Sequence, residues 1–503
     1  MKVSVQPLPI DAGSARPAIL AVYAPFGSDR TLSDFPEGRT RELLDHPLVH
    51  HLQAVAGKGV DVLALVDRVE AESAWIRIPA NAPAEMEVSF TGKQDMGDWR
   101  SLSELLVRAG RLVEGGAVLL ALEGHGAGYL PELDLGALNA AVDQRFGGIE
   151  WRLGQTHVPF KADGQRAVLE GAPVLPVGCP VTPTDQPVLS TWALGQALAD
   201  AAERTGHPVA AIHFNNCFNM SVEVLHTVSP HALFATGYCN YNFFTAGQVY
   251  PAVFERLAAV GTAGLADVAR WFAEENHRLL AAHGHEPTVA GTVDLARMHD
   301  IVEKVDDLAD ALLAALRTTG AAERPALLAK IRDAIDRAQQ YDARPDLDLG
   351  GSDELTDLDS LAAELLKADF SPFRVAAAAD ALRGALAGIK VYGDKGSPWM
   401  DTSKGWDFSS KNLAMNIYLP DPLRQGLWDW RAQYYLDVNP DPRHPKVQKH
   451  LIDFVKVTDW VDFLIEYHRD VPFVGLRPAR SVRFPVMAGR TAGRRPGDGS
   501  SAG

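Results

Sequence analysis

Residues 208–236 read PVAAIHFNNCFNMSVEVLHTVSPHALFAT. The apolar run 209–214 predicts a buried strand and residues 215–217 a tight polar turn. A helix that includes Val222, Val224 and Leu225 is expected next, and 232–235 predicts a second buried strand. Two uniformly apolar strands joined through a helix are typical of a parallel sheet covered on both faces. Cys217 is then expected at the carboxyl end of a strand, where the next helix begins and its N–H groups favour a thiolate. A nucleophile would be placed there.

A second apolar run upstream ends in another reactive side chain. Residues 117–122 read AVLLAL and are followed by Glu123-Gly124-His125-Gly126. The carboxyl ends of parallel strands meet at one edge of a sheet, where α/β proteins place their sites. We therefore predict that His125 and Cys217 form a Cys/His pair.

Further apolar runs at residues 18–23 and 61–66 extend the expected sheet. The fold class that we predict is α/β, a mostly parallel sheet between two layers of helices, within residues 1–255. Residues 146–188 form a long loop insertion rich in Gly, Pro and Thr. Residues 256–476 are rich in Ala and Leu and predict a mainly helical region that packs on the sheet and returns one or two strands to it. The tail 477–503 is rich in Arg, Gly and Ser and is expected to be disordered.

Composition restricts the classes of partner. The 503 residues carry a net charge of −16, which argues against nucleic acid and against an anionic membrane. The first residues lack the apolar core of a secretory signal and no stretch is long and apolar enough to span a bilayer, so we expect a cytoplasmic protein. Three cysteines, Cys179, Cys217 and Cys239, are too few for a disulfide framework or a four-ligand zinc site.

Metal ligands are not expected. Two groups of residues could suggest a metal, but their spacing fits no specific site: His277, His283, His285 and His299, and the acidic residues Asp342, Asp346, Asp348 and Asp353. We predict surface or packing histidines and a solvated acidic linker instead. No metal and no cofactor is expected, and calcium dependence stays open.

Several segments together resemble the clostripain-type cysteine peptidases, a family within the caspase-like fold group. The segments, in chain order, are Asp95-Met-Gly-Asp98 with Leu102, His125-Gly126-Ala-Gly128-Tyr129, Phe214-Asn-Asn-Cys217-Phe-Asn-Met220-Ser-Val-Glu223-Val, Thr292-Val-Asp-Leu295, Asp357-Leu-Asp-Ser-Leu361, Ile417-Tyr-Leu-Pro420 and 460–467. Each is weak alone, and their order and spacing make the resemblance specific. It implies a caspase-like three-layer sandwich.

The resemblance also implies the roles of the site residues. Cys217 would be the nucleophile of a cysteine endopeptidase that acts on proteins or peptides through a thioester, and His125 would be its general base and acid. The backbone N–H groups of Gly126 and Cys217 would form the oxyanion hole. Gly126 would keep a side chain from crowding the substrate. No third acid is implied.

The sequence departs from the family at the residue two places before the cysteine. The family has an aspartate there, in or beside a pocket for Lys or Arg, whereas this chain has Asn215, and residues 236–250 contain no Asp or Glu. A guanidinium buried without a carboxylate would be costly. We therefore predict a neutral or aromatic-walled pocket, with Asn215, Thr236, Tyr238 and Cys239 as substrate-binding candidates. For Cys239 a packing role stays equally open.

Three alternatives remain open from the sequence. The chain could be a catalytically silent caspase-like module that binds a partner, because a fold does not fix a function. It could be a peptidase that stays latent until a partner or signal activates it. The 146–188 loop, with Lys161, Arg166 and Asp185, could be cut for activation or be a plain surface insertion. The sequence does not determine the natural substrate or the oligomeric state.

Overall fold

The structure is a computed structural model of the chain. The part of the chain that it describes comprises residues 10–11, 18–28, 30–34, 42–124, 126, 128–130, 132–133, 151–152, 161–162, 165–166, 174–175, 189–240, 242, 245–283, 289–341, 355–395, 415–419 and 448–468. His125, Cys179, most of the 146–188 loop and the 477–503 tail lie outside these residues.

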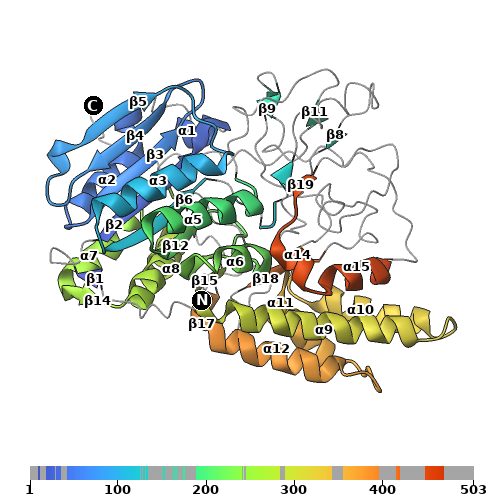
Figure 1. Cartoon of the computed structure of the whole chain (residues 1–503). Helices are drawn as coiled ribbons and strands as arrows, with labels where there is room; N and C mark the ends of the chain where they lie inside the picture. Colours follow the sequence, from blue (N-terminus) through green and yellow to red (C-terminus); the bar gives the residue numbers. More distant parts are fainter. Residues whose placement is uncertain are drawn as a thin grey trace, which may run out of the picture.

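Within the described residues, the main sheet has nine strands in the order β17-β15-β13-β12-β6-β2-β3-β4-β5 (Figure 1). Its centre is five neighbouring parallel strands: β13 (Ala232–Tyr238), β12 (Val209–Asn215), β6 (Ala117–Glu123), β2 (Ala18–Pro25) and β3 (Asp61–Asp67). The pairs at both sides are antiparallel: β4 (Ser73–Ile78) and β5 (Glu87–Thr91) at one, β15 (Val289–Asp294) and β17 (Lys390–Lys395) at the other. These five strands are apolar along most of their length, as expected for a parallel sheet that is buried on both faces.

Helices cover both faces of this sheet. On one face the apolar core includes side chains of α2 (Pro47–Ala56), α7 (Tyr250–Val260) and α8 (Leu265–His283). On the other face the larger core includes side chains of α3 (Trp99–Leu112), α5 (Thr191–Thr205) and α6 (Val222–Val228). The molecule is therefore an α/β sandwich of three layers around a large mixed sheet whose centre is parallel, which confirms the predicted fold class.

The region from residue 256 onward shares its core with the sheet. The helices α9 (Met298–Thr318), α10 (Arg324–Arg337), α11 (Leu358–Lys367) and α12 (Val375–Ile389) add their apolar side chains to the larger core. The strands β15 and β17 of this region extend the main sheet itself. The boundary that we placed after residue 255 lies inside α7.

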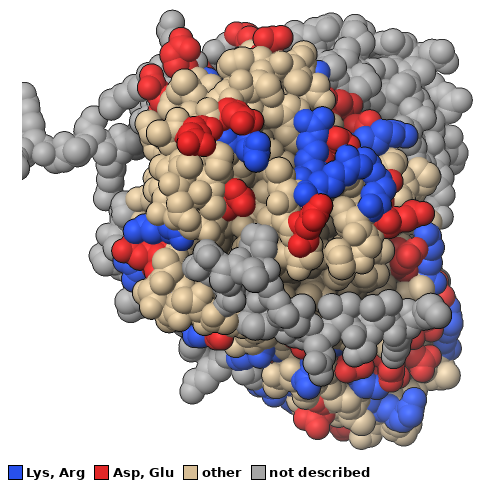
Figure 2. All heavy atoms as spheres, turned by 60° about the vertical axis from the view of Figure 1, so that its left-hand side comes forward, with Lys and Arg blue, Asp and Glu red and all other residues tan. Residues whose placement is uncertain are grey.

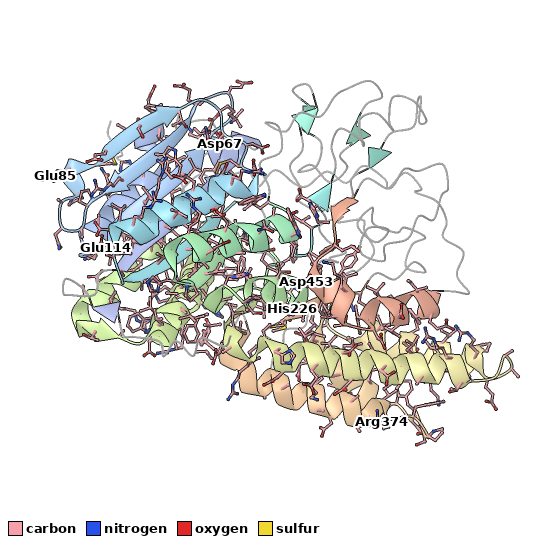
Figure 3. All side chains as sticks on the ribbon, in the orientation of Figure 1. Asp67, Glu85, Glu114, His226, Arg374 and Asp453 are labelled. Carbon is pink, nitrogen blue, oxygen red and sulfur yellow. The ribbon has the colours of Figure 1, made fainter. Side chains whose placement is uncertain are left out.

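The strand β18 (Asn416–Tyr418) and the helix α14 (Asp453–Val457), near the end of the described chain, lie next to α6. The strand β18 pairs with β16 (Leu355–Asp357), and α14 is followed by α15 (Trp460–His468). His226 of α6 and Asp453 of α14 lie close together in Figure 3, and the His226 and Phe454 rings are 6.3 Å apart. Residues far apart in the sequence thus support the helix that follows Cys217.

The surface carries charges of both signs. Figure 2 shows a face on which Lys and Arg side chains lie close to Asp and Glu side chains. Among the residues described, no helix combines the length and apolarity that crossing a bilayer would need. The same residues contain no cluster of three His, Cys, Asp or Glu side chains arranged to hold a metal ion.

Candidate active site

Cys217 lies in the turn that follows β12, at the carboxyl edge of the parallel strands. The strand ends at Asn215, and α6 begins only at Val222, where the hydroxyl of Ser221 accepts a hydrogen bond from the N–H of Val224. The expectation that the next helix begins at the cysteine is therefore wrong. Because the helix-terminus effect is confined to the first turn, α6 does not supply the expected preference for thiolate.

The backbone of this turn is strained. Phe218, the residue after the cysteine, has φ 63°, a conformation that costs a bulky residue energy unless its surroundings enforce it. Asn416 of β18 provides part of that enforcement: its side-chain amide donates to the carbonyls of Phe218 at 3.1 Å and Cys239 at 2.9 Å. Its backbone N–H donates to the carbonyl of Met220 at 2.8 Å.

The thiol of Cys217 is almost covered, since the residue is 8% exposed. Its Sγ accepts from the backbone N–H of Asn242 at 3.3 Å and lies 3.6 Å from the carbonyl oxygen of the same residue. Burial raises the pKa of Cys217 to about 11, although the N–H groups of Asn242 and Gly126 act in the opposite direction. A thiol in this setting is protonated near neutral pH and needs a base to react.

Gly126 packs directly against the nucleophile turn. A Cβ atom at this position would lie 2.1 Å from the carbonyl oxygen of Cys217 and 2.9 Å from its nitrogen. A side chain at position 126 would therefore collide with the backbone of Cys217, whereas the expectation that it would also crowd a substrate stays a prediction. The contact brings the segment that ends in Gly126 next to the segment that carries Cys217.

Beneath the turn, a buried hydrogen-bond network joins the sheet to α7 and α8. Asn215 and Glu123 are register partners on β12 and β6, and the Asn215 amide donates to both carboxyl oxygens of Glu123 at 3.0 Å. The Tyr250 hydroxyl also donates to Glu123. Asn242 donates from its side chain to the Asn215 oxygen at 2.9 Å and accepts from Asn276 at 3.0 Å.

Glu123 is the functional candidate that the sequence reasoning missed. It is 1% exposed, and burial raises its pKa to about 7, against the effect of the hydrogen bonds from Tyr250 and Asn215. Residues 236–250 contain no acid, and the acid beside Asn215 instead comes from β6, the strand that pairs with β12. The available signal was position, since Glu123 precedes His125 by the same two residues by which Asn215 precedes Cys217.

The structure assigns the other predicted substrate-binding residues to different surroundings. The Tyr238 hydroxyl accepts from the Asn276 amide and so joins the network. Thr236 accepts from the Thr292 hydroxyl at 3.0 Å within the sheet. Cys239 is 0% exposed within the larger core, so the described geometry favours the packing role over the lining role for its side chain.

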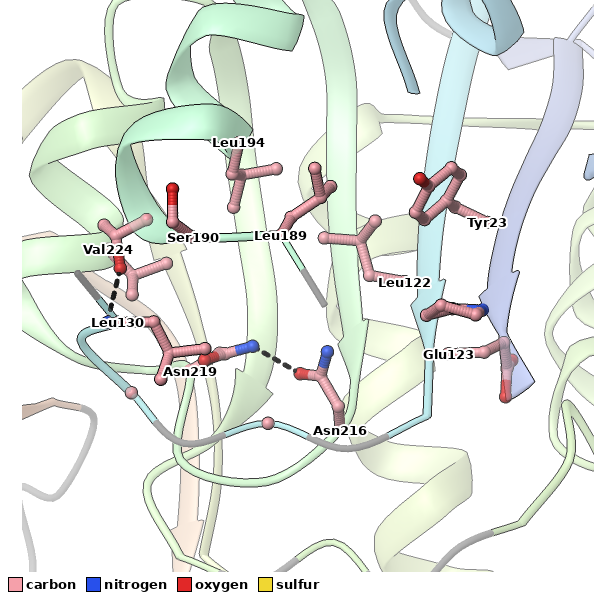
Figure 4. A pocket seen from close by; sticks show the side chains of 14 residues that line it. Tyr23, Leu122, Glu123, Leu130, Leu189, Ser190, Leu194, Asn216, Asn219 and Val224 are labelled. Atoms are coloured by element: carbon pink, nitrogen blue, oxygen red, sulfur yellow. Dashed lines mark hydrogen bonds between the residues drawn. The ribbon is translucent and has the colours of Figure 1, made fainter. Parts of the chain in front are cut away.

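A pocket opens beside the nucleophile turn (Figure 4). Asn216 and Asn219 lie along one side of it, where the Asn219 amide donates to the Asn216 oxygen at 2.7 Å. Most of the remaining wall is apolar and includes Leu122, Leu130, Leu189 and Leu194. Glu123 and Gly126 also line it. The pocket could therefore hold an uncharged group beside Gly126.

The comparisons identify this fold among solved structures. A secreted C11 cysteine protease from Bacteroides thetaiotaomicron, iotapain, matches with a TM-score of 0.50 and 11% identity over 80% of this chain and 94% of that chain. The secreted C11 cysteine protease from the same organism in complex with an irreversible peptide inhibitor matches with a TM-score of 0.50 and 13% identity over 88% and 99% of the two chains. No protein-family profile matches this chain, and no curated protein sequence matches it.

The class that fold and site define is the caspase-like α/β sandwich with a cysteine at the carboxyl edge of its parallel strands. Within that class the chain has the fold of the C11, clostripain-type cysteine proteases, as the resemblance of its motifs predicted. At this level of identity the likeness concerns the fold.

Proposed function

We propose that this protein is a cysteine endopeptidase with Cys217 as its nucleophile and His125 as its general base and acid. The observation that carries the proposal is the contact of Gly126, the residue after His125, with the backbone of Cys217. Two motifs that were singled out separately in the sequence meet at this contact, and they do so at the edge of the sheet where α/β proteins bind ligands.

The chemistry follows from the buried thiol. His125 would take the proton from Sγ as the sulfur attacks the substrate carbonyl, and the N–H groups of Gly126 and Cys217 would stabilise the oxyanion. The bond to the leaving amine then breaks as His125 returns the proton, which leaves a thioester on Cys217. Water, activated by the neutral imidazole, hydrolyses the thioester and releases the acid product.

An uncharged side chain at the cleaved position is the preference that we propose. The carboxyl group nearest to Asn215 in the described network belongs to Glu123, and both of its oxygens already accept hydrogen bonds from Asn215. With the pKa of Glu123 raised to about 7, the group is partly neutral near neutral pH and a weak partner for a guanidinium. The mainly apolar pocket beside Gly126 also suits an uncharged group.

One set of peptide electrophiles tests both parts of the proposal. Peptides with a cysteine-reactive group after Leu, Phe, Asn, Lys or Arg should label the wild-type chain at Cys217, the first three faster than the last two. Labelling should be absent in Cys217→Ala and suppressed at least about tenfold in His125→Ala, because the thiol then lacks its base. Labelling is read by mass spectrometry of the peptide that contains Cys217.

The outcomes separate the alternatives. Equal labelling of wild type and His125→Ala would contradict the pair and favour the silent binding module. Fastest labelling by the Arg or Lys peptide would contradict the proposed preference. Labelling of wild type that appears only after cleavage within residues 146–188 would indicate a latent peptidase. The cytoplasmic location and the need for an activating partner stay predictions.

A further inference from the structure

The Glu123 carboxyl group determines the orientation of the Asn215 amide. An asparagine amide has one end that donates and one end that accepts. The Nδ2 of Asn215 lies 3.0 Å from both oxygens of Glu123, so this end faces β6. Its Oδ1 therefore faces the opposite way, where it accepts from Asn242 at 2.9 Å and from the Thr245 hydroxyl at 3.4 Å.

Asn242 connects this oriented amide to the thiol. The side chain of Asn242 bonds to Asn215, while its backbone N–H donates to Sγ of Cys217 at 3.3 Å. Asn276 of α8 holds the other side of the Asn242 side chain at 3.0 Å. A chain of two side chains thus leads from Glu123 to a backbone group that contacts the sulfur. Glu123, Asn215 and Asn242 are 1%, 1% and 5% exposed, so water does not substitute for these bonds.

If the acceptor at position 123 were removed, nothing would keep the donor end of the Asn215 amide turned towards β6 and its oxygen turned towards Asn242. The Asn215 amide could then turn over to offer its oxygen elsewhere, and its donor end would meet the donor end of Asn242. Asn242 would lose a bond that fixes its side chain, and its backbone N–H would no longer be held against Sγ.

We propose that Glu123 is a positioning residue for the nucleophile, which fixes Cys217 through Asn215 and Asn242. This inference rests on the proposed function, because it takes Cys217 as the reacting group. In this role Glu123 acts through Asn215 and Asn242 and not through a contact with the thiol. Among the described residues, the donors of hydrogen bonds to its carboxyl group are the Asn215 amide from β12 and the Tyr250 hydroxyl from α7.

The test exchanges the carboxyl and the amide across the two strands. Asn215→Asp alone sets two carboxyl groups about 3 Å apart and removes the donor, so it should misplace Asn242. In the double variant Glu123→Gln with Asn215→Asp, the amide at position 123 donates to the carboxyl group at position 215. The other oxygen of that carboxyl group can still accept from Asn242, as the Asn215 oxygen does in the wild type. Glu123→Leu removes the acceptor altogether. Glu274→Gln, which neutralises an acid on α8 that pairs with Arg256 and Arg270, is the matched control.

The readout is the rate of alkylation of Cys217 by iodoacetamide between pH 6 and 9, followed on the Cys217 peptide of the full-length chain. Asn215→Asp and Glu123→Leu should lower the rate at pH 7.5 at least about tenfold, the size expected for a misplaced reactive group. The double variant should recover to within about threefold of wild type, and Glu274→Gln should match wild type. Thermal unfolding shows which variants fold.

Two results would overturn the proposal. One is a double variant as slow as Asn215→Asp, which shows that the two positions do not act as a pair. The other is a folded Glu123→Leu protein with the wild-type rate and pH profile, which leaves Glu123 a packing role. Because alkylation needs no peptide turnover, these results are independent of whether the chain cleaves peptides. A chain that positions its thiol through Glu123 and yet cleaves no peptide would refute the proposed function alone.

Discussion

The buried groups around Cys217 favour neutral forms, and this defines the chemistry at the residue scale. Burial raises the pKa of Cys217 to about 11 and that of Glu123 to about 7, and it lowers the pKa of His213 to about 3. Near neutral pH the Cys217 thiol and the His213 ring are therefore uncharged, and Glu123 is only partly ionised. A thiol held neutral in this way requires a base at the moment of attack, which is the role proposed for His125.

His213 gives a prediction about stability and pH. Its ring is 1% exposed, stacks on Phe272 at a centroid distance of 4.7 Å and meets Tyr250 edge-on at 5.8 Å. Because burial lowers the pKa of folded His213 to about 3, below the ordinary histidine value of 6.5, the unfolded chain binds a proton as pH falls below about 6.5 while the folded chain does not. As pH falls from 6 to 4, His213 should therefore lower the free energy of unfolding by about 1 kcal/mol per pH unit.

The measurement is urea unfolding at several pH values. His213→Phe should show a flatter dependence on pH than wild type, whereas the exposed His299→Gln should keep the wild-type slope. Identical slopes in wild type and His213→Phe would mean that His213 is protonated in the folded protein.

The position of a single residue could be predicted where the sequence around it determines the local structure. The apolar run before Cys217 was enough to predict its place at the end of a strand. Glu123 was not predicted, because its partner Asn215 lies 92 positions away and is brought beside it by the pairing of two strands that do not follow each other in the chain. For Gly126 the sequence predicted a need for glycine but not the backbone that it contacts.

At the scale of elements, β18 acts as a brace for the nucleophile turn. Asn416 is 0% exposed and contacts Met220, Phe218 and Cys239, so one residue ties the turn after β12 to the end of β13. Local patterns could not predict this contact, since 198 positions separate Asn416 from Phe218. The helix boundary after Cys217 was wrong for a related reason. The brace holds residues 217–221 in an irregular turn that local helix propensity would not favour.

Asn416→Asp should destabilise the chain by about 3 kcal/mol, because it removes the donor to two buried carbonyls and faces them with oxygen instead. The same change should lower the rate of Cys217 alkylation, since the turn loses its brace. Asn81→Asp, at an exposed position in the connection between β4 and β5, is the control. It should change the free energy of unfolding by no more than about 0.5 kcal/mol and leave the alkylation rate unchanged. A folded Asn416→Asp protein with wild-type stability would show that the turn holds its own shape.

At the scale of the whole molecule, the helical region and the sheet share one core. The sequence indicated a change of character near residue 255, and the structure shows helices after that point, but β15 and β17 return to the sheet and α8 lies under β12 and β13. Composition could reveal the change from strands to helices. It could not reveal which segments pair, because strand pairing between distant segments leaves no local pattern. The expectation that this region returns one or two strands to the sheet is confirmed by β15 and β17.

We therefore expect that a chain ending at residue 261, after α7, does not fold alone. It would leave β13 without its partner β15 and uncover the face of β12 and β13 on which α8 packs. An unpaired apolar strand at the edge of a sheet promotes aggregation, so this fragment should be insoluble or lack a cooperative thermal transition. A chain ending at residue 476, which removes only the predicted tail, should keep the wild-type transition and the labelling of Cys217. Size-exclusion chromatography, circular dichroism and labelling of both chains make the comparison. A soluble, cooperatively folded chain of residues 1–261 would instead mean that the later region is a separate domain resting on a complete sheet.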